Sequence, residues 1–245
     1  MKSWLSGILS RDPEASIARR LAKRKYWSEP LDTPKKKAHA WFDSLIRDHG
    51  FTRVIYPNRH EIAPGIYRSS QPTPGQLRWF KRQGGRTVLA LRGANYGGSL
   101  ALERRATEEE GLVFVQWAAK AALIVAPEKI LELIDMLRTM QTPVLIHCKS
   151  GADRMGFVAV IYAHVILGQP IEKALEQLSL RYGHIKYSRT GVLDVFFDSY
   201  LQARGDGELS FEDWLRHGCD SDAINASFKK NRLVAFFEEK ILRRE

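Results

Sequence analysis

Short apolar runs alternate with longer amphipathic stretches through the middle of the chain. Three runs hold few polar residues, at 87–91 (TVLAL), 112–117 (LVFVQW) and 143–147 (PVLIH). Such runs are typical of strands that are buried on both faces of a parallel sheet. A β-rich alternating segment at 51–56 predicts another strand, and residues 61–69 predict a hairpin that bends at Pro64-Gly65.

The amphipathic stretches between these runs predict helices. Thr73 and Pro74 are an N-cap and a first-turn proline, so a helix is expected from there to Gly84-Gly85. Further helices are expected at 100–110, 127–140, 154–167, 171–182, 190–203, 210–217 and 222–244. Strands that alternate with helices of this length predict an α/β fold, with a central and mainly parallel sheet flanked by helices.

The chain divides into three predicted regions, which are 1–50, 51–204 and 205–245. Residues 1–50 form a basic extension with a short helix at 13–27, and residues 1–40 carry ten Lys and Arg against four Asp and Glu. This arm either lies on an anionic membrane surface or packs Trp27 and Trp41 onto the main domain. Residues 51–204 form the α/β domain, and residues 205–245 form a helical C-terminal extension.

Composition narrows the class of protein. The 245 residues are 44% apolar and carry a net charge of +10, with two cysteines. Two cysteines exclude a disulfide scaffold, so a reducing and therefore cytoplasmic location is expected, with peripheral contact at the inner membrane face as an option. The opening residues do not resemble a signal peptide, and no apolar run is long enough to span a bilayer. The charge suggests an anionic partner, but no nucleic-acid-binding motif accompanies it.

The candidate chemistry lies at 143–156, where a buried strand leads through a glycine-containing loop into an apolar helix. Consecutive loop amides and a helix N-terminus form a site for a phosphate-sized anion. The same positive field favours the thiolate form of Cys148, which is the nucleophilic form. Arg154 follows six residues later and can grip two phosphate oxygens, while Gly151 permits a tight backbone approach.

The motif His147-Cys148-x5-Arg154-x-Gly156 resembles the phosphate-binding loop of the protein tyrosine phosphatase superfamily. The upstream segment IYRSSQPTPGQLRWFKRQGGRTVLALRG resembles the bacterial and atypical dual-specificity branch of that superfamily. This resemblance covers about residues 51–204. It implies a cysteine-phosphatase fold with Cys148 as nucleophile and no metal or cofactor. The phosphate would be held by the loop residues, which are Lys149, Ser150, Gly151, Ala152, Asp153 and Arg154.

Two positions depart from the usual pattern of the family. The region about thirty residues before Cys148 contains no acid, although the family has an Asp there as proton donor. Asp153 is the predicted donor instead, and the alternative is that it orients Arg154 or caps the helix. Met155 stands where the family usually has Ser or Thr, so it cannot assist the leaving thiolate. Ser150 is a possible substitute.

Other charged residues are expected near the phosphate pocket. His147 precedes the nucleophile, Arg68 and Arg92 stand at predicted strand ends, and Lys120 lies in the acid-free segment. A surface ion pair is the alternative role for each of the two arginines. His184 is either a turn residue or a group at the pocket edge. Cys219 is expected to be an ordinary packing residue.

The predicted function is a cysteine-dependent phosphatase that hydrolyses phosphate monoesters of the phosphotyrosine or dual-specificity type. Its partner would be a phosphorylated protein, or an anionic small-molecule or lipid phosphate. One alternative is a phosphoinositide, phospholipid or inositol-phosphate phosphatase of the same fold. Another is a weakly active pseudophosphatase that binds phosphorylated partners. A sulfurtransferase fits less well because Arg154 and the loop length match phosphate.

Overall fold

The structure, a computed structural model, describes residues 13–93 and 97–228. Within these residues five strands form one sheet in the order β1-β2-β5-β3-β4. Strands β2, β5, β3 and β4 run parallel, and β1 pairs antiparallel with β2, so the predicted mainly parallel sheet is confirmed. The strands are β1 (His60–Ala63), β2 (Ile66–Ser69), β3 (Thr87–Ala90), β4 (Val113–Gln116) and β5 (Val144–His147).

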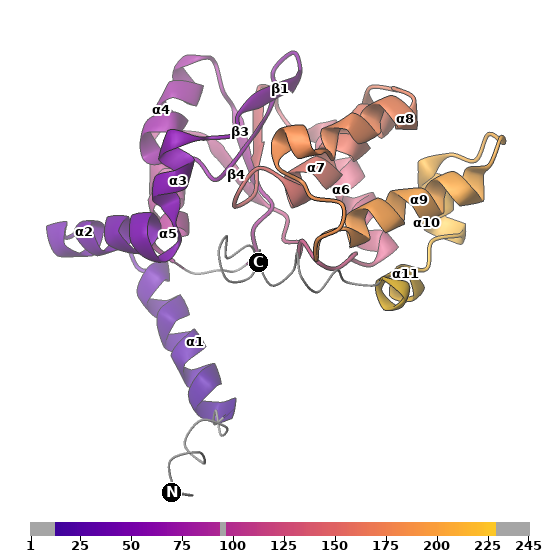
Figure 1. Ribbon diagram of the computed structural model, residues 1–245. Helices are drawn as coiled ribbons and strands as arrows, with labels where there is room; N and C mark the ends of the chain where they lie inside the picture. The colour runs from indigo at the N-terminus through magenta and orange to yellow at the C-terminus, as the bar shows by residue number, and fades with distance from the viewer. Residues whose placement is uncertain (1–12, 94–96, 229–245) are drawn as a thin grey trace, which may run out of the picture.

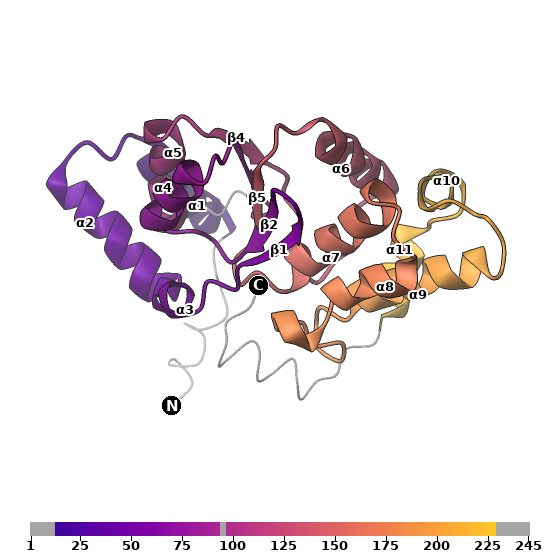
Figure 2. The ribbon, with the colours of Figure 1, turned by 90° about the horizontal axis from the view of Figure 1, so that it is seen from above.

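Helices cover both faces of this sheet (Figures 1 and 2). Val88 and Leu145 face a small cluster under α4 (Pro74–Arg82) and α5 (Gly98–Glu109). Their neighbours Leu89 and Ile146 face the larger cluster on the other side. This alternation is what strands buried on both faces require, since successive side chains point to opposite faces. The larger cluster lies under α6 (Pro127–Thr139), α7 (Asp153–Ile161), α9 (Val192–Arg204) and α10 (Phe211–His217).

Helix α4 begins where the sequence predicts, with Thr73 as its N-cap and Pro74 as its first residue. Thr73 accepts a hydrogen bond from the Gln76 amide, and the Gln76 side chain accepts one from the Thr73 amide, which closes a capping box. The helix expected at 154–167 runs as α7 and then a π-helical turn, η3 (Tyr162–Ile166).

The helix expected at 171–182 is interrupted. It comprises α8 (Ile171–Ala174) and two 3₁₀ turns, η4 (Leu175–Gln177) and η5 (Leu180–Tyr182), and it ends at Gly183 with φ 82°. The left-handed conformation at Gly183 terminates the helical backbone there. The last expected helix begins as α11 (Ser221–Ser227), and its remainder at 229–244 lies outside the described residues.

The strand predicted at 51–56 is wrong, because this segment forms helix α3 (Gly50–Ile55). Its apolar side chains do not line a buried face: Phe51 is 49% exposed and Ile55 is 82% exposed. The alternating apolar residues therefore do not form one buried face of a strand. His49 enters the helix in the left-handed conformation (φ 54°), and the Tyr56 amide donates to the Thr52 carbonyl to close the last turn.

The N-terminal region consists of α1 (Pro13–Ser28), α2 (Pro34–Phe42) and the π-helical turn η2 (Asp43–Arg47), followed by α3. Trp27, Leu31 and Ala40 pack with residues of α5 in a small cluster. This confirms the expected packing of Trp27 on the main domain, whereas Trp41 is 38% exposed. The membrane-surface role of the arm stays a prediction.

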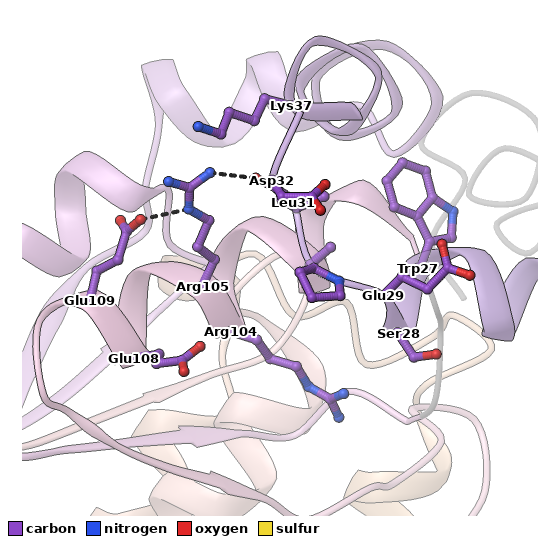
Figure 3. A pocket seen from close by; sticks show the side chains of 12 residues that line it. Trp27, Ser28, Glu29, Leu31, Asp32, Lys37, Arg104, Arg105, Glu108 and Glu109 are labelled. Atoms are coloured by element: carbon purple, nitrogen blue, oxygen red, sulfur yellow. Dashed lines mark hydrogen bonds and ion pairs between the residues drawn. The ribbon is translucent and has the colours of Figure 1, made fainter. Parts of the chain in front are cut away.

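A hollow of about 550 Å³ lies where the turn between α1 and α2 meets α5. Figure 3 shows the side chains that line it. Arg105 spans it by donating to the Leu31 carbonyl at 2.8 Å and by pairing with Glu109 at 2.6 Å. The N-terminal region is thus attached to the domain through both apolar and polar contacts. None of the helices in residues 13–93 and 97–228 is long and apolar enough to cross a membrane.

Candidate active site

Four parallel strands end at the same edge of the sheet, and the chemical motif begins there. Ser69 of β2 and Ala90 of β3 both stand opposite His147, the last residue of β5. The residues that follow these ends, Ser70, Leu91 and Cys148, therefore meet at the carboxyl edge. Ligands bind at this edge in open α/β sheets, especially beside a topological switch point.

The backbone of the loop after β5 is held from outside through its carbonyl groups. Asn58 donates to the Ser150 carbonyl at 3.1 Å, and the Gln71 amide donates to the Lys149 carbonyl at 3.3 Å. Gly151 has φ 75°, and a Cβ atom there would lie 2.7 Å from the Ser70 amide nitrogen. Only glycine fits this conformation and this close approach.

Cys148 and Arg154 lie at the two ends of the loop. The Cys148 Sγ atom accepts a hydrogen bond from the Gly151 amide at 3.2 Å, so at least one loop amide is aimed at the sulfur. Arg154 is the second residue of α7 and is 7% exposed. Ala152 precedes the helix and is fully buried. The expected strand, loop and helix arrangement is therefore present. The roles of its residues stay predictions.

The acid-free segment at 118–126 lies beside Arg154. Arg154 Nη1 is 3.4 Å from the Ala119 carbonyl oxygen, and Lys120 and Arg154 line the same small hollow. Asn225 of α11 fixes the segment by exchanging two hydrogen bonds with the Ile124 backbone, at 2.8 and 2.9 Å. The C-terminal region thus helps to place the segment that contains Lys120.

Arg68 does not line the pocket mouth, so that prediction is wrong. Its side chain is fully buried, and Nη2 donates to the Gly151 carbonyl at 3.0 Å. The guanidinium also lies 3.7 Å from the centre of the Tyr182 ring and donates twice to Gln177 at 2.8 Å. Arg68 supports the loop from beneath, through a carbonyl, rather than facing the phosphate site.

Asp48 of the N-terminal region binds three cationic side chains near the loop. It pairs with Arg92 at 2.8 Å, Arg53 at 2.9 Å and Lys149 at 3.3 Å. Burial alone would raise the pKa of Asp48, but these three charges outweigh it and hold the pKa well below its ordinary value. Arg92 also donates to Gln71, so it is engaged in a buried network and not in a surface ion pair.

His147 is also placed differently from the expectation, because its side chain is fully buried and does not line the pocket. Its Nε2 atom lies 2.5 Å from Glu103 Oε1 of α5. Glu103 is equally buried, and its other oxygen, Oε2, accepts a hydrogen bond from Gln71 Nε2 at 2.7 Å. His147 therefore anchors the end of β5 to the helix layer.

Asp153 is the first residue of α7, and its carboxylate is 6% exposed. Its Oδ1 atom accepts from His184 Nδ1 at 2.8 Å and from Thr190 Oγ1 at 2.9 Å. His184 Nε2 lies 2.8 Å from Asp194 Oδ2 of α9. His184 is therefore no isolated turn residue but links two carboxylates behind the loop.

Met155 points into the protein core, where it is fully buried in the larger cluster. It supplies no donor to the loop, as the sequence predicts. Ser150 instead faces a groove of about 380 Å³, which it lines together with Lys149 and Tyr182. The far wall of this groove is built from residues 48–58, which include Phe51 and Tyr56. The end of the N-terminal region and helix α3 thus shape the space beside the loop.

Sequence reasoning missed several residues of this site, including Asp48, Asn58, Glu103, Thr190 and Asp194. None of them stands in a motif. Asp48, Asn58 and Thr190 contact residues 149–153 directly, whereas Glu103 contacts His147 and Asp194 contacts His184. For Thr190 and Asp194, their closeness to the polar run that starts at His184 is the only sequence signal. No cluster of side chains suited to a metal ion occurs among residues 13–93 and 97–228.

Strand, Cys-x5-Arg loop and helix at the carboxyl edge of a parallel sheet define a domain of the cysteine-phosphatase type. The model of a family described as "DSP-PTPase phosphatase fused to NAD+ kinase" matches residues 49–189. This match covers more than half of the chain, and the chain belongs to this family of dual-specificity and tyrosine phosphatase domains.

Individual relatives share only about a quarter of the aligned residues with this chain. The chain is 26% identical over 144 residues to the dual specificity protein phosphatase TpbA of Pseudomonas aeruginosa. The alignment covers 57% of this chain and spans 62% of the length of TpbA. A structure of TpbA with pTyr superimposes with a TM-score of 0.45 at 20% identity, over 70% of this chain and 90% of that one. The structure of Tk-PTP in its active form superimposes with a TM-score of 0.47 at 21% sequence identity. The match covers 56% of this chain and 94% of that one.

Proposed function

We propose that this protein is a cysteine-dependent phosphatase that hydrolyses phosphate monoesters of the phosphotyrosine or dual-specificity type. The observation that carries the proposal is the loop between β5 and α7. There, a backbone amide is aimed at Cys148 Sγ, and Arg154 stands at the start of the following helix. Family membership supports the same activity.

The proposed reaction has two steps. The Cys148 thiolate attacks phosphorus, so an S–P bond forms and the P–O bond to the leaving group breaks. Water then attacks the phosphocysteine, which releases inorganic phosphate and restores the thiolate. Arg154 and the loop amides bind the phosphoryl oxygens in both steps, and these fixed donors stabilise the charge of each transition state.

The leaving group also needs a proton, and Asp153 is the predicted donor. Asp153 carries an ion pair and a hydrogen bond at one carboxylate oxygen. These contacts favour the alternative in which Asp153 orients the loop. An Asp153→Asn variant distinguishes the two roles. A rate loss confined to alkyl phosphates supports proton donation, and an equal loss on aryl phosphates supports orientation.

Lipid phosphates are a second candidate substrate class. The groove beside Ser150 is lined by Phe51 of α3 and by Tyr56, which follows α3, and these side chains are 49% and 59% exposed. Large exposed apolar side chains beside a phosphate site suit an amphiphilic substrate or a membrane surface. This class is consistent with the predicted cytoplasmic location and peripheral contact at the inner membrane face.

A substrate panel tests the proposal. It comprises phosphotyrosine and phosphoserine peptides, phosphoinositides, phosphatidylglycerol phosphate and inositol polyphosphates, each assayed with wild type and Cys148→Ser. Hydrolysis that the substitution abolishes supports the enzyme, and the preferred substrate selects between the two classes. Binding of phosphorylated ligands without any hydrolysis supports the pseudophosphatase alternative.

A further inference from the structure

His184 lies behind the phosphate-binding loop, in contact with carboxylates on both sides. It follows the left-handed Gly183, and its side chain is 1% exposed. Nδ1 is 2.8 Å from Asp153 Oδ1, and Nε2 is 2.8 Å from Asp194 Oδ2. The two acids come from different helices, α7 and α9. The imidazole therefore joins the start of α7 to α9.

This geometry fixes the protonation state of the ring. An ionised carboxylate can only accept hydrogen bonds, so a ring with a carboxylate at each nitrogen makes both bonds only as an imidazolium. Burial opposes the charge, but the hydrogen bonds and charges of Asp153 and Asp194 outweigh it and raise the pKa of His184 to about 9. Asp153 and Asp194 are the charged groups that contact His184 in the described part of the chain, and the nearby Ser188 and Thr190 hydroxyl groups are neutral.

The link reaches the phosphate site through two adjacent residues. Asp153 and Arg154 are the first and second residues of α7. The Asp153 oxygen that binds His184 also accepts from Thr190, whose hydroxyl contacts Ser188 at 2.8 Å. The position of the Asp153 carboxylate is thus set by His184 and its surroundings. Arg154 lies in the same first turn of α7, so a shift of Asp153 also moves Arg154.

We propose that His184 is a positioning residue of the phosphate-binding loop, which acts as an imidazolium that holds Asp153 and thereby fixes the turn that presents Arg154 to phosphate. The inference rests on the proposed function of the loop. His184 itself cannot protonate a leaving group in this arrangement, because both of its N–H groups are already donated to carboxylates.

The test replaces one carboxylate by an amide of the same shape. Asp194→Asn leaves a hydrogen-bonding oxygen for His184 but removes a negative charge, so His184 is expected to lose its proton nearer to neutral pH. The matched control is Asp198→Asn on the same helix, where Asp198 pairs with the exposed Lys186 at 3.8 Å. Aryl phosphate hydrolysis is measured from pH 6 to 8.5 as the ratio of wild-type to variant kcat/KM, which cancels titrations that both proteins share.

We expect this ratio to rise about tenfold between pH 6 and 8.5 for Asp194→Asn, because the hydrogen bond from His184 to Asp153 loses its charge assistance as the ring deprotonates. The ratio should stay flat for Asp198→Asn. A second variant, His184→Gln, carries no charge at any pH and should show a loss of about tenfold throughout. A ratio for Asp194→Asn that does not change with pH, or an unchanged rate for His184→Gln, would overturn the proposal.

Sulfate binding separates this inference from the proposed function. Sulfate remains a dianion over the whole pH range, and its affinity is measured by calorimetry in a Cys148→Ser background with and without each second substitution. If wild type hydrolyses nothing but Asp194→Asn weakens sulfate binding as pH rises, positioning holds and the phosphatase assignment fails. If wild type hydrolyses phosphate esters, but neither Asp194→Asn nor His184→Gln changes the affinity for sulfate, the phosphatase assignment holds and the positioning role is wrong.

Discussion

Asp48 is expected to hold the N-terminal region against the loop between β5 and α7 by charge. Its side chain is 16% exposed and pairs with Arg53, Arg92 and Lys149. Asp48→Asn removes the negative charge and leaves the two arginines close together without it. Removal of one member of a buried ion pair costs about 3–5 kcal/mol, and partial exposure places Asp48 near the lower end. A loss of about 3 kcal/mol corresponds to a fall in Tm of about 6–12 °C for a domain of this size.

The assay is the free energy of unfolding in urea, measured for wild type and Asp48→Asn at several pH values. The folded-state pKa of Asp48 is depressed, so its contribution is fully present above the ordinary value of 3.8 and is lost as pH falls toward the folded value. The difference should therefore be constant from pH 7 to about 5 and shrink below that.

A surface pair provides the control for this prediction. Glu29 is 51% exposed and pairs with Lys36 at 2.9 Å, so Glu29→Gln should cost less than about 1 kcal/mol. If Asp48→Asn costs no more than Glu29→Gln at pH 7, the charge-based attachment is refuted. A loss that persists unchanged below pH 4 would show instead that the charge of Asp48 does not matter.

Two further predictions concern the loop and the second cysteine. Gly151→Ala should reduce kcat/KM at least tenfold, because its Cβ would meet the Ser70 amide; Gly168→Ala, with φ 68° and open space around it, should lower Tm slightly and leave kcat/KM unchanged. Burial, with Asp220 and Glu128, raises the pKa of Cys219 to about 11. Iodoacetamide at pH 7.5 should therefore modify Cys148 well before Cys219 by peptide mass analysis, and equal rates would contradict this.

The sequence predicts the parts of the fold whose signals are local. Four residues of the run at 143–147 form β5 (Val144–His147), and each of these four side chains is buried, as the apolar pattern predicts. Thr73 and Gln76 begin α4 through contacts between residues three apart. The segment at 51–56 shows the limit of this reasoning. Its β-rich alternation resembles a strand, yet it forms α3, since packing against neighbouring elements outweighs such propensities.

The site divides in the same way. Cys148, Gly151 and Arg154 lie within seven consecutive residues, so their arrangement follows from the strand, loop and helix that contain them. The surrounding network brings together residues far apart in the chain, as in the contact between Asp48 and Lys149. No spacing rule predicts such contacts. Arg68 illustrates the consequence, because its place at a strand end is compatible with facing the phosphate or, as found, with supporting the loop from beneath.

Detection of a phosphocysteine intermediate tests directly whether Cys148 is the nucleophile. Wild type is mixed with a ³²P-labelled aryl phosphate, quenched with acid within milliseconds and digested for peptide mapping. If Cys148 is the nucleophile, label appears on the peptide that contains it, decays as inorganic phosphate forms, and is absent in Cys148→Ser. Steady hydrolysis by Cys148→Ser at the wild-type rate, or hydrolysis by wild type with label on another residue, would contradict this role.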